Sequence, residues 1–305
     1  MIKIRRPPEL AHGPSRGACG SCCHHFGFAM MSTLLVLTDF FRAADRALDY
    51  ATNLAQPLGA RLVLLHVRRD ALLDPERFTG GLSNLSQEAI DLVMNQLAGN
   101  LAVPVVAEVG HGRVSDAVAD AAGRHHPVLI VLGRPDYSGT PDELVNTTAL
   151  DILRTSPRPL LVVPHNVNSS SSSSSPRRVL LAADGEPFGL GPYAGPARQV
   201  LAALHAALTV LHVAPDSDAA ALAAALESVV RTGLEVELPT PVLSISKVAA
   251  DPAEGILQVA QPADYDLVVL IARPRSFLGK LFHRSVTARV LLHSTVPVLI
   301  LPATD

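Results

Sequence analysis

The chain has 305 residues, which is enough for two ordinary domains or for one large α/β domain. Hydrophobic residues make up 48% of it and charged residues 17%, so the chain can bury a core, and a disordered protein is excluded. The net charge is −3 and aromatic residues make up only 4%. Because neither positive charge for phosphates nor rings for stacked bases are in surplus, no nucleic-acid partner is expected.

The apolar runs and the cysteines bear on the cellular compartment. The apolar runs fall short of the roughly 18 uninterrupted residues of a membrane helix, so we expect a soluble protein with no membrane partner. The 3 cysteines all lie within residues 19–23, which excludes a disulfide scaffold and favours the reducing cytoplasm. Prolines follow the basic start of the chain where a signal peptide would have an apolar segment, so none is expected.

Residues 1–30 show neither helical nor strand periodicity, and we expect folding to begin at about Met31. This tract is interpreted as a disordered extension, or as upstream sequence included by a misplaced start codon. Its cysteines lie beside His24 and His25, and such side chains bind zinc or copper. No second ligand pair follows at finger-like spacing, so no metal site is predicted.

A serine run divides the remaining chain into two halves. Residues 168–175 contain seven consecutive serines, which cannot bury apolar surface and form a flexible tether of at most about 25 Å. We therefore predict a first domain over residues 31–167 and a second domain over residues 176–305. They are called the first half and the second half below.

Both halves contain the same series of short aliphatic runs, which are typical of buried strands. In the first half the runs are Leu34–Leu37, Arg61–Val67, Val103–Val109, Val128–Leu132 and Leu160–Val163. In the second half they are Val179–Ala182, Leu208–Val213, Val242–Ile245, Leu267–Ile271 and Val298–Leu301. Four landmark pairs occupy matching places: Asp39 with Asp184, His66 with His212, Gly133 with Ala272, and Pro159 with Pro297.

Amphipathic stretches separate these runs and predict helices. They are Ala43–Ala55, Asp116–Ala122 and Thr147–Arg154 in the first half, and Pro196–Ala206, Ala253–Ala260 and Ser285–Leu292 in the second. Strands without alternation, separated by helices, indicate a parallel sheet covered on both faces. Each half is therefore predicted to be a doubly wound α/β domain of five strands, whose ligands bind beyond the carboxyl ends of the strands where the winding reverses.

The order of these segments resembles the universal stress protein family. The first half carries LLVLTDF, LGARLVLLHV, VLIVLG and TSPRPLLVVP, and the second carries RVLLAADG, ALTVLHV, DPAEGILQVA, DLVVLIA and STVPVLILP. The resemblance covers nearly all of both halves. It implies tandem Rossmann-like domains, of the adenine nucleotide alpha hydrolase type, packed as a pseudo-dimer.

Members of this family that bind ATP carry the motif Gly-x2-Gly-x9-Gly-Ser/Thr after the fourth strand, where main-chain N–H groups and the hydroxyl face phosphates. In the first half this motif reads Gly133-x2-Asp136-x9-Asn146-Thr147. Gly133 and Thr147 remain as candidate ligand residues, but two of the three glycines are lost. Because a carboxylate replaces one of them and repels a triphosphate, ATP is not expected to bind well there.

In the second half the motif reads Ala272-x2-Arg275-x8-Arg284-Ser285, without glycine and with a shorter spacer. Arginine side chains can bind phosphate in place of the lost backbone donors, and hydroxyls remain at the start of a helix. If either half binds ATP, ADP or another anion, the second half is the candidate, and the alternative is a solvated basic loop. The candidate residues are Arg273, Arg275, Arg284, Ser285 and Thr287.

Asp39 and Asp184 follow the first strand of each half. The resemblance implies that the matching aspartate lies beside adenine and ribose, whereas the alternative is that each aspartate caps the following turn. Capping is favoured for Asp39, and both readings stay open for Asp184. Val213 lies where the family packs its backbone against adenine, and otherwise it is simply the end of a buried strand.

No catalytic residue is predicted, because the Gly-x-Ser-x-Gly and P-loop motifs are absent. Family members pair through their fifth strands, so the aliphatic runs Leu160–Val163 and Val298–Leu301 predict pairing between the halves, with homodimerisation left open. The predicted function is a non-enzymatic, regulatory stress-response protein with degenerate nucleotide sites. The alternative is a sensor whose second half binds ATP or another adenine nucleotide, with or without slow hydrolysis.

Overall fold

The computed structural model describes residues 31–40, 42–68, 86–136, 148–167, 175–273 and 285–304. The first half contains β1 (Thr33–Thr38), β2 (Arg61–Arg68), β3 (Val105–His111), β4 (Leu129–Arg134) and β5 (Leu160–Pro164). The second half contains β6 (Arg178–Ala182), β7 (Ala207–Ala214), β8 (Leu243–Val248), β9 (Leu267–Ala272) and β10 (Val298–Pro302). All ten predicted strands are therefore present, and the outermost two, β3 and β8, begin and end later in the chain than predicted.

The strands form one sheet in the order β3-β2-β1-β4-β5-β10-β9-β6-β7-β8. Within each half all pairs are parallel, as predicted for a doubly wound domain. The winding reverses between β1 and β4 in the first half and between β6 and β9 in the second. These two positions are the crevices where a ligand of such a sheet would bind.

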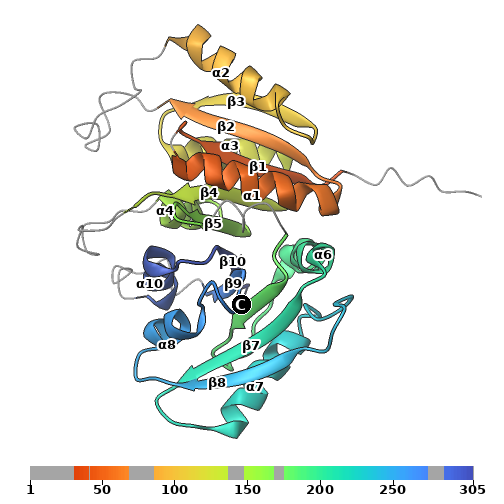
Figure 1. Ribbon diagram of the computed structural model, residues 1–305, viewed down its shortest axis with the longest axis vertical. Helices are drawn as coiled ribbons and strands as arrows, with labels where there is room; N and C mark the ends of the chain where they lie inside the picture. The colour runs from red at the N-terminus through yellow and green to blue at the C-terminus, as the bar shows by residue number, and fades with distance from the viewer. Residues whose placement is uncertain are drawn as a thin grey trace, which may run out of the picture. The chain divides into compact units, whose positions relative to one another are not determined.

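Eight α-helices lie in the described residues (Figure 1). Those that pack on one face are α1 (Arg42–Leu58), α2 (Gln87–Gly99), α6 (Ala194–Leu204) and α7 (Ala219–Val230). Those on the other face are α3 (Val114–His125), α4 (Thr148–Thr155), α8 (Pro252–Val259) and α10 (Val286–His293). A short 3₁₀ helix, η3 (Gly191–Tyr193), precedes α6. No helix among the described residues combines the length and apolar character needed to cross a membrane.

The halves meet where β5 and β10 pair antiparallel, with Val162 opposite Val298 and Leu161 opposite Leu299. Both strands are buried along their whole length. The apolar layer on each face of the sheet runs across this boundary, since each layer contains side chains from both strands. Two five-stranded sheets are thus joined edge to edge into a single ten-stranded sheet with one antiparallel pair.

A repeated histidine contact shows how the first strands of the halves correspond. His66 Nδ1 lies 3.0 Å from the carbonyl oxygen of Thr38, and His212 Nδ1 lies 3.1 Å from that of Ala183. Thr38 therefore corresponds to Ala183, and the residues that follow them are Asp39 and Asp184. The predicted matches of these aspartates and histidines are consistent with this geometry.

The predicted match of Gly133 with Ala272 is one residue off. Leu129 pairs with Leu34 of β1, and Leu267 pairs with the corresponding residue of β6, so β4 and β9 are offset by 138 residues (267 − 129 = 138). Ala272 then corresponds to Arg134 (272 − 134 = 138). Arg134, the last residue of β4, and Arg273, the residue after β9, both precede a proline in the sequence but do not occupy matching positions in the sheet. Because side chains alternate along a strand, a shift of one residue places them on opposite faces of the sheet.

Candidate functional site

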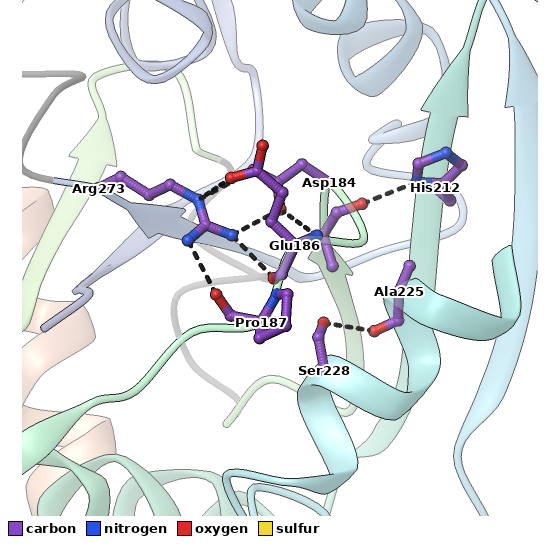
Figure 2. A network of polar contacts seen from close by, with 8 residues as sticks. Asp184, Glu186, Pro187, His212, Ala225, Ser228 and Arg273 are labelled. Carbon is purple, nitrogen blue, oxygen red and sulfur yellow. Dashed lines mark hydrogen bonds and ion pairs between the residues drawn. The ribbon is translucent and has the colours of Figure 1, made fainter. Parts of the chain in front are cut away.

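A network of polar contacts surrounds Arg273, the residue directly after β9, at the position where the strand order of the second half reverses (Figure 2). Its guanidinium donates to both carboxylate oxygens of Asp184, from Nε at 3.0 Å and from Nη2 at 2.8 Å. It also donates to the carbonyl oxygens of Glu186 at 2.8 Å and Pro187 at 3.1 Å. The Glu186 carboxylate adds an ion pair at 3.7 Å. Arg273 and Asp184, both predicted ligand residues, thus bind each other, and Arg273 also binds the loop that follows Asp184.

Exposure in this network is uneven. The Arg273 side chain is only 12% exposed, whereas those of Asp184 and Glu186 are 53% and 56% exposed. The Asp184 carboxylate also accepts from the backbone N–H of Glu186 at 3.1 Å, which is the turn-capping contact considered in the sequence. A phosphate approaching Arg273 would therefore have to displace a two-point carboxylate contact, which is among the stronger hydrogen-bond arrangements in proteins.

His212 and Val213 form the neighbouring wall at the end of β7. The His212 side chain is buried and bonds the strand end that precedes Asp184 (Figure 2). Val213 packs against Gly255 of α8, where an added Cβ would lie 2.4 Å from Val213 Cγ1. Val213 therefore has a packing role in this structure, because it sets how closely α8 approaches the sheet.

Ser285 caps α10 at the start of this helix. Its Oγ accepts from the backbone N–H of Ala288 at 3.1 Å, which satisfies one of the free donors of the first turn. Thr287 is buried at 5% exposure. The other two predicted ligand residues, Arg275 and Arg284, lie outside the described residues.

In the first half, Gly133 lies within β4 and against the backbone of α1. A Cβ on Gly133 would lie 2.1 Å from the carbonyl oxygen of Ala43 and 2.8 Å from the nitrogen of Ala44. The absence of a side chain is therefore required for close packing of a helix on a strand, whatever contact the residue makes with a ligand. Thr147, the other predicted ligand residue of this half, lies outside the described residues.

The first-half crevice has an aromatic ring beside Asp39. Phe40 stacks on His66 with ring centroids 4.4 Å apart and an interplanar angle of 25°. Its backbone has φ of 65°, an uncommon conformation for a bulky residue. Burial lowers the pKa of His66 and outweighs the Thr38 hydrogen bond and the Asp39 charge, both of which act to raise it.

Sequence reasoning missed Phe40 and Glu186 as crevice residues. Each lies one or two residues beyond the predicted aspartate, so proximity to the strand end was the available signal. Among the described residues there is no group of three metal-ligating side chains.

A separate charged cluster lies at the edge of the first half. Glu108 on β3 accepts from Arg124 at 2.9 Å and lies 2.5 Å from Nε2 of His125, both at the end of α3. Desolvation by itself raises the pKa of Glu108, but these hydrogen bonds and charges outweigh it, and the net effect lowers the pKa. This cluster fixes α3 to the edge strand.

The fold defines a tandem Rossmann-like protein, with one reversal of strand order in each half. A model of the Universal stress protein family matches residues 30–164 and again residues 176–302. The chain therefore belongs to the universal stress protein family and contains two of its domains. Comparison with curated proteins gave no match.

Solved structures with the same fold cover most of the chain. A universal stress protein from Archaeoglobus fulgidus DSM 4304 is 19% identical, with a TM-score of 0.63 over 88% of this chain and 98% of that one. A putative universal stress protein from Pseudomonas aeruginosa UCBPP-PA14 is 17% identical, with a TM-score of 0.58 over 90% and 94%. The cytoplasmic domain of a prokaryotic cation chloride cotransporter is 11% identical, with a TM-score of 0.50 over 90% and 96%. At these identities the similarity shows the fold alone.

Proposed function

We propose that this universal stress protein is a non-enzymatic, cytoplasmic regulator that acts through protein contacts and does not depend on bound nucleotide. The observation that carries the proposal is the two-point ion pair between Arg273 and Asp184. Arg273 and Asp184 are two of the residues predicted to contact a nucleotide in the second half, and here they bind each other. Removing Arg273 would also release the loop at residues 186–187, whose carbonyl oxygens accept from its guanidinium.

The first half supports the same proposal. Its motif lacks two glycines and carries Asp136, whose carboxylate lies 3.7 Å from His165 at the end of β5. Phe40 also covers one face of His66, which lies near the end of β2. Backbone donors for phosphate and an open face for a planar ligand are therefore both reduced.

Calorimetric titration of the full chain with ATP and with ADP, each up to about 1 mM, tests the proposal. A site with a dissociation constant well below this concentration would give saturable heat in this titration. Because the proposal requires no bound nucleotide, we expect no saturable heat from the wild-type chain. Saturable binding that Asp184→Asn or Arg273→Met weakens would overturn the proposal. Arg124→Met is the matched control, because this arginine is also in a carboxylate pair but lies away from both crevices.

The alternative is that the second half binds an adenine nucleotide, and the feature that favours it is Ser285 at the start of α10. As the helix cap its oxygen is an acceptor, which leaves the hydroxyl proton free to be donated to an anion. Ser285→Asp keeps an N-cap side chain but adds a negative charge, whereas Ser285→Ala removes the cap. If ATP binds, and Ser285→Asp abolishes this binding while the helix stays as stable as in the wild type, the sensor function is favoured.

We also propose that the β5–β10 pairing holds the halves together in solution, with no need for a second copy of the chain. Its support is the complete burial of two aliphatic strands, which would promote aggregation if they were exposed. Homodimerisation through another surface is compatible with it.

A further inference from the structure

Arg134 is a buried arginine that links the two halves. It is the last residue of β4, and only 8% of it is exposed. Its Nη1 donates to the carbonyl oxygen of Leu291 at 2.5 Å, and its Nη2 donates to that of Ser294 at 2.7 Å. Both acceptors belong to the C-terminal end of α10 in the second half. A guanidinium of one half therefore caps a helix of the other.

The chemistry of this contact suits a strong link. The carbonyl groups in the last turn of a helix have no partner within the helix, and the helix dipole makes this end partly negative. Arginine stays charged in proteins, and its planar group can donate to two acceptors at once. Ser294 is itself fixed, because its Oγ donates to the carbonyl of Val296 at 2.6 Å and accepts from the N–H of the same residue at 3.1 Å.

The positions of Arg134 and α10 connect the two candidate sites. Arg134 lies directly after Gly133, within the segment that matches the nucleotide motif of the first half. The opposite end of α10 is capped by Ser285, at the motif of the second half. Along this helix of eight residues the two ends are about 12 Å apart. One side chain and one short helix thus span from the first site to the second.

The second half has no arginine at the matching position. The residue of the second half that corresponds to Arg134 in the sheet register is Ala272, which has no side-chain donor. The helix of the first half that corresponds to α10 is α4, and Ala272 cannot cap it in the same way. Two halves that repeat each other in fold therefore differ at this contact.

We propose that Arg134 is a coupling residue, which makes the end of β4 beside the first candidate site and helix α10 of the second half respond together. The coupling does not depend on whether either half binds nucleotide. A change at one end of α10, or at the end of β4, alters the order of the other element through the Arg134 side chain. Such coupling has the same magnitude in both directions.

Hydrogen exchange of the full chain, measured by mass spectrometry, tests the first direction. Arg134→Met keeps the length of the side chain but removes both donors, so peptides over residues 290–296 should exchange at least about tenfold faster. Peptides over α6 and α7 should keep their wild-type rates. Arg124→Met is the control, because it removes an exposed arginine of the same half and should leave residues 290–296 unchanged.

Ser285→Ala tests the opposite direction, since it loosens α10 from its far end. In the wild-type background this substitution should accelerate exchange at residues 129–136, and in the Arg134→Met background that acceleration should disappear. A purely structural role would give the same response in both backgrounds. The proposal is overturned if the responses are equal, if residues 290–296 are unchanged in Arg134→Met, or if all peptides accelerate uniformly. If Arg134→Met does not fold, Arg134→Lys keeps the charge and should give an intermediate response.

Discussion

The sharpest prediction concerns Gly133, because its position separates a packing role from a ligand role. In Gly133→Ala the new Cβ would lie 2.1 Å from the carbonyl oxygen and 2.3 Å from the carbonyl carbon of Ala43. Real Cβ atoms do not approach other atoms below 3.0 Å, and here the neighbours are backbone atoms that cannot rotate away. The start of α1 would have to move away from β4 by about 1 Å, which is the difference between the 2.1 Å contact and the 3.0 Å limit.

The cost follows from what this movement disrupts. Inserting a methyl group into a well-packed core usually costs about 1–3 kcal/mol, and backbone neighbours place this site at or above the upper limit. The first two turns of α1 also carry Ala44 and Ala47, which are buried and would lose contacts. We therefore expect the free energy of unfolding of the first half to fall by about 3 kcal/mol or more.

Urea unfolding followed by circular dichroism measures this cost, since the chain has no tryptophan. With a slope of roughly 1–3 kcal/mol/M, the midpoint of the first-half transition should fall by at least about 1 M. Gly123→Ala is the matched control, because Gly123 is an exposed residue of α3 with nothing near its added Cβ. It should stabilise the chain by roughly 0.5–1 kcal/mol. A Gly133→Ala variant as stable as the wild type would refute the packing argument.

Three further predictions concern charge, capping and strand pairing. Glu108→Gln should lower the melting temperature at pH 7, because the pKa of Glu108 is depressed in the folded chain. The stability that Glu108 contributes is present above its ordinary pKa of 4.5 and is lost as the pH falls through the folded value. A difference in melting temperature between variant and wild type that stays constant down to pH 2 would contradict this. Ser285→Ala should cost about 1 kcal/mol through loss of the α10 cap, whereas Ser285→Asp should cost much less, and equal losses in chemical denaturation would count against capping. Val162→Lys and Leu299→Glu should each separate the halves and raise the radius of gyration measured by X-ray scattering. Adding Val298→Glu to Val162→Lys should partly reverse the change, because these two residues are opposite each other. An unchanged radius of gyration in the single variants would argue against the pairing.

The strands could be located from the sequence because most of them are buried on both faces. Such strands read as continuous aliphatic runs, and all ten runs coincide with strands in the structure. The ends of β3 and β8 were less accurate, since these edge strands bury fewer side chains and carry polar residues such as Glu108 and Lys247. Helices α2 and α7 were missed for opposite reasons. In α2 only Ile90 and Met94 are buried, which leaves little periodicity, and α7 is so rich in alanine that its buried and exposed faces have nearly the same composition.

The crevices show where sequence reasoning stops. Arg273 and Asp184 were both identified as ligand residues, but their mutual ion pair depends on the adjacency of β6 and β9, which are far apart along the chain. In the same way, the packing role of Gly133 depends on α1, about 90 residues earlier (133 − 43 = 90).

The sequence alone determined that this chain contains two copies of a doubly wound domain, because burial on both faces of a parallel sheet imposes a pattern that each strand carries locally. Only the tertiary structure decided which polar groups satisfy one another. The one-residue difference in offset between β4 and β9 sends Arg134 to the end of α10 and Arg273 to Asp184, although the dipeptides that contain them match in sequence. The reason is that strand register fixes the face on which a side chain lies, and register is set by contacts between strands rather than within them.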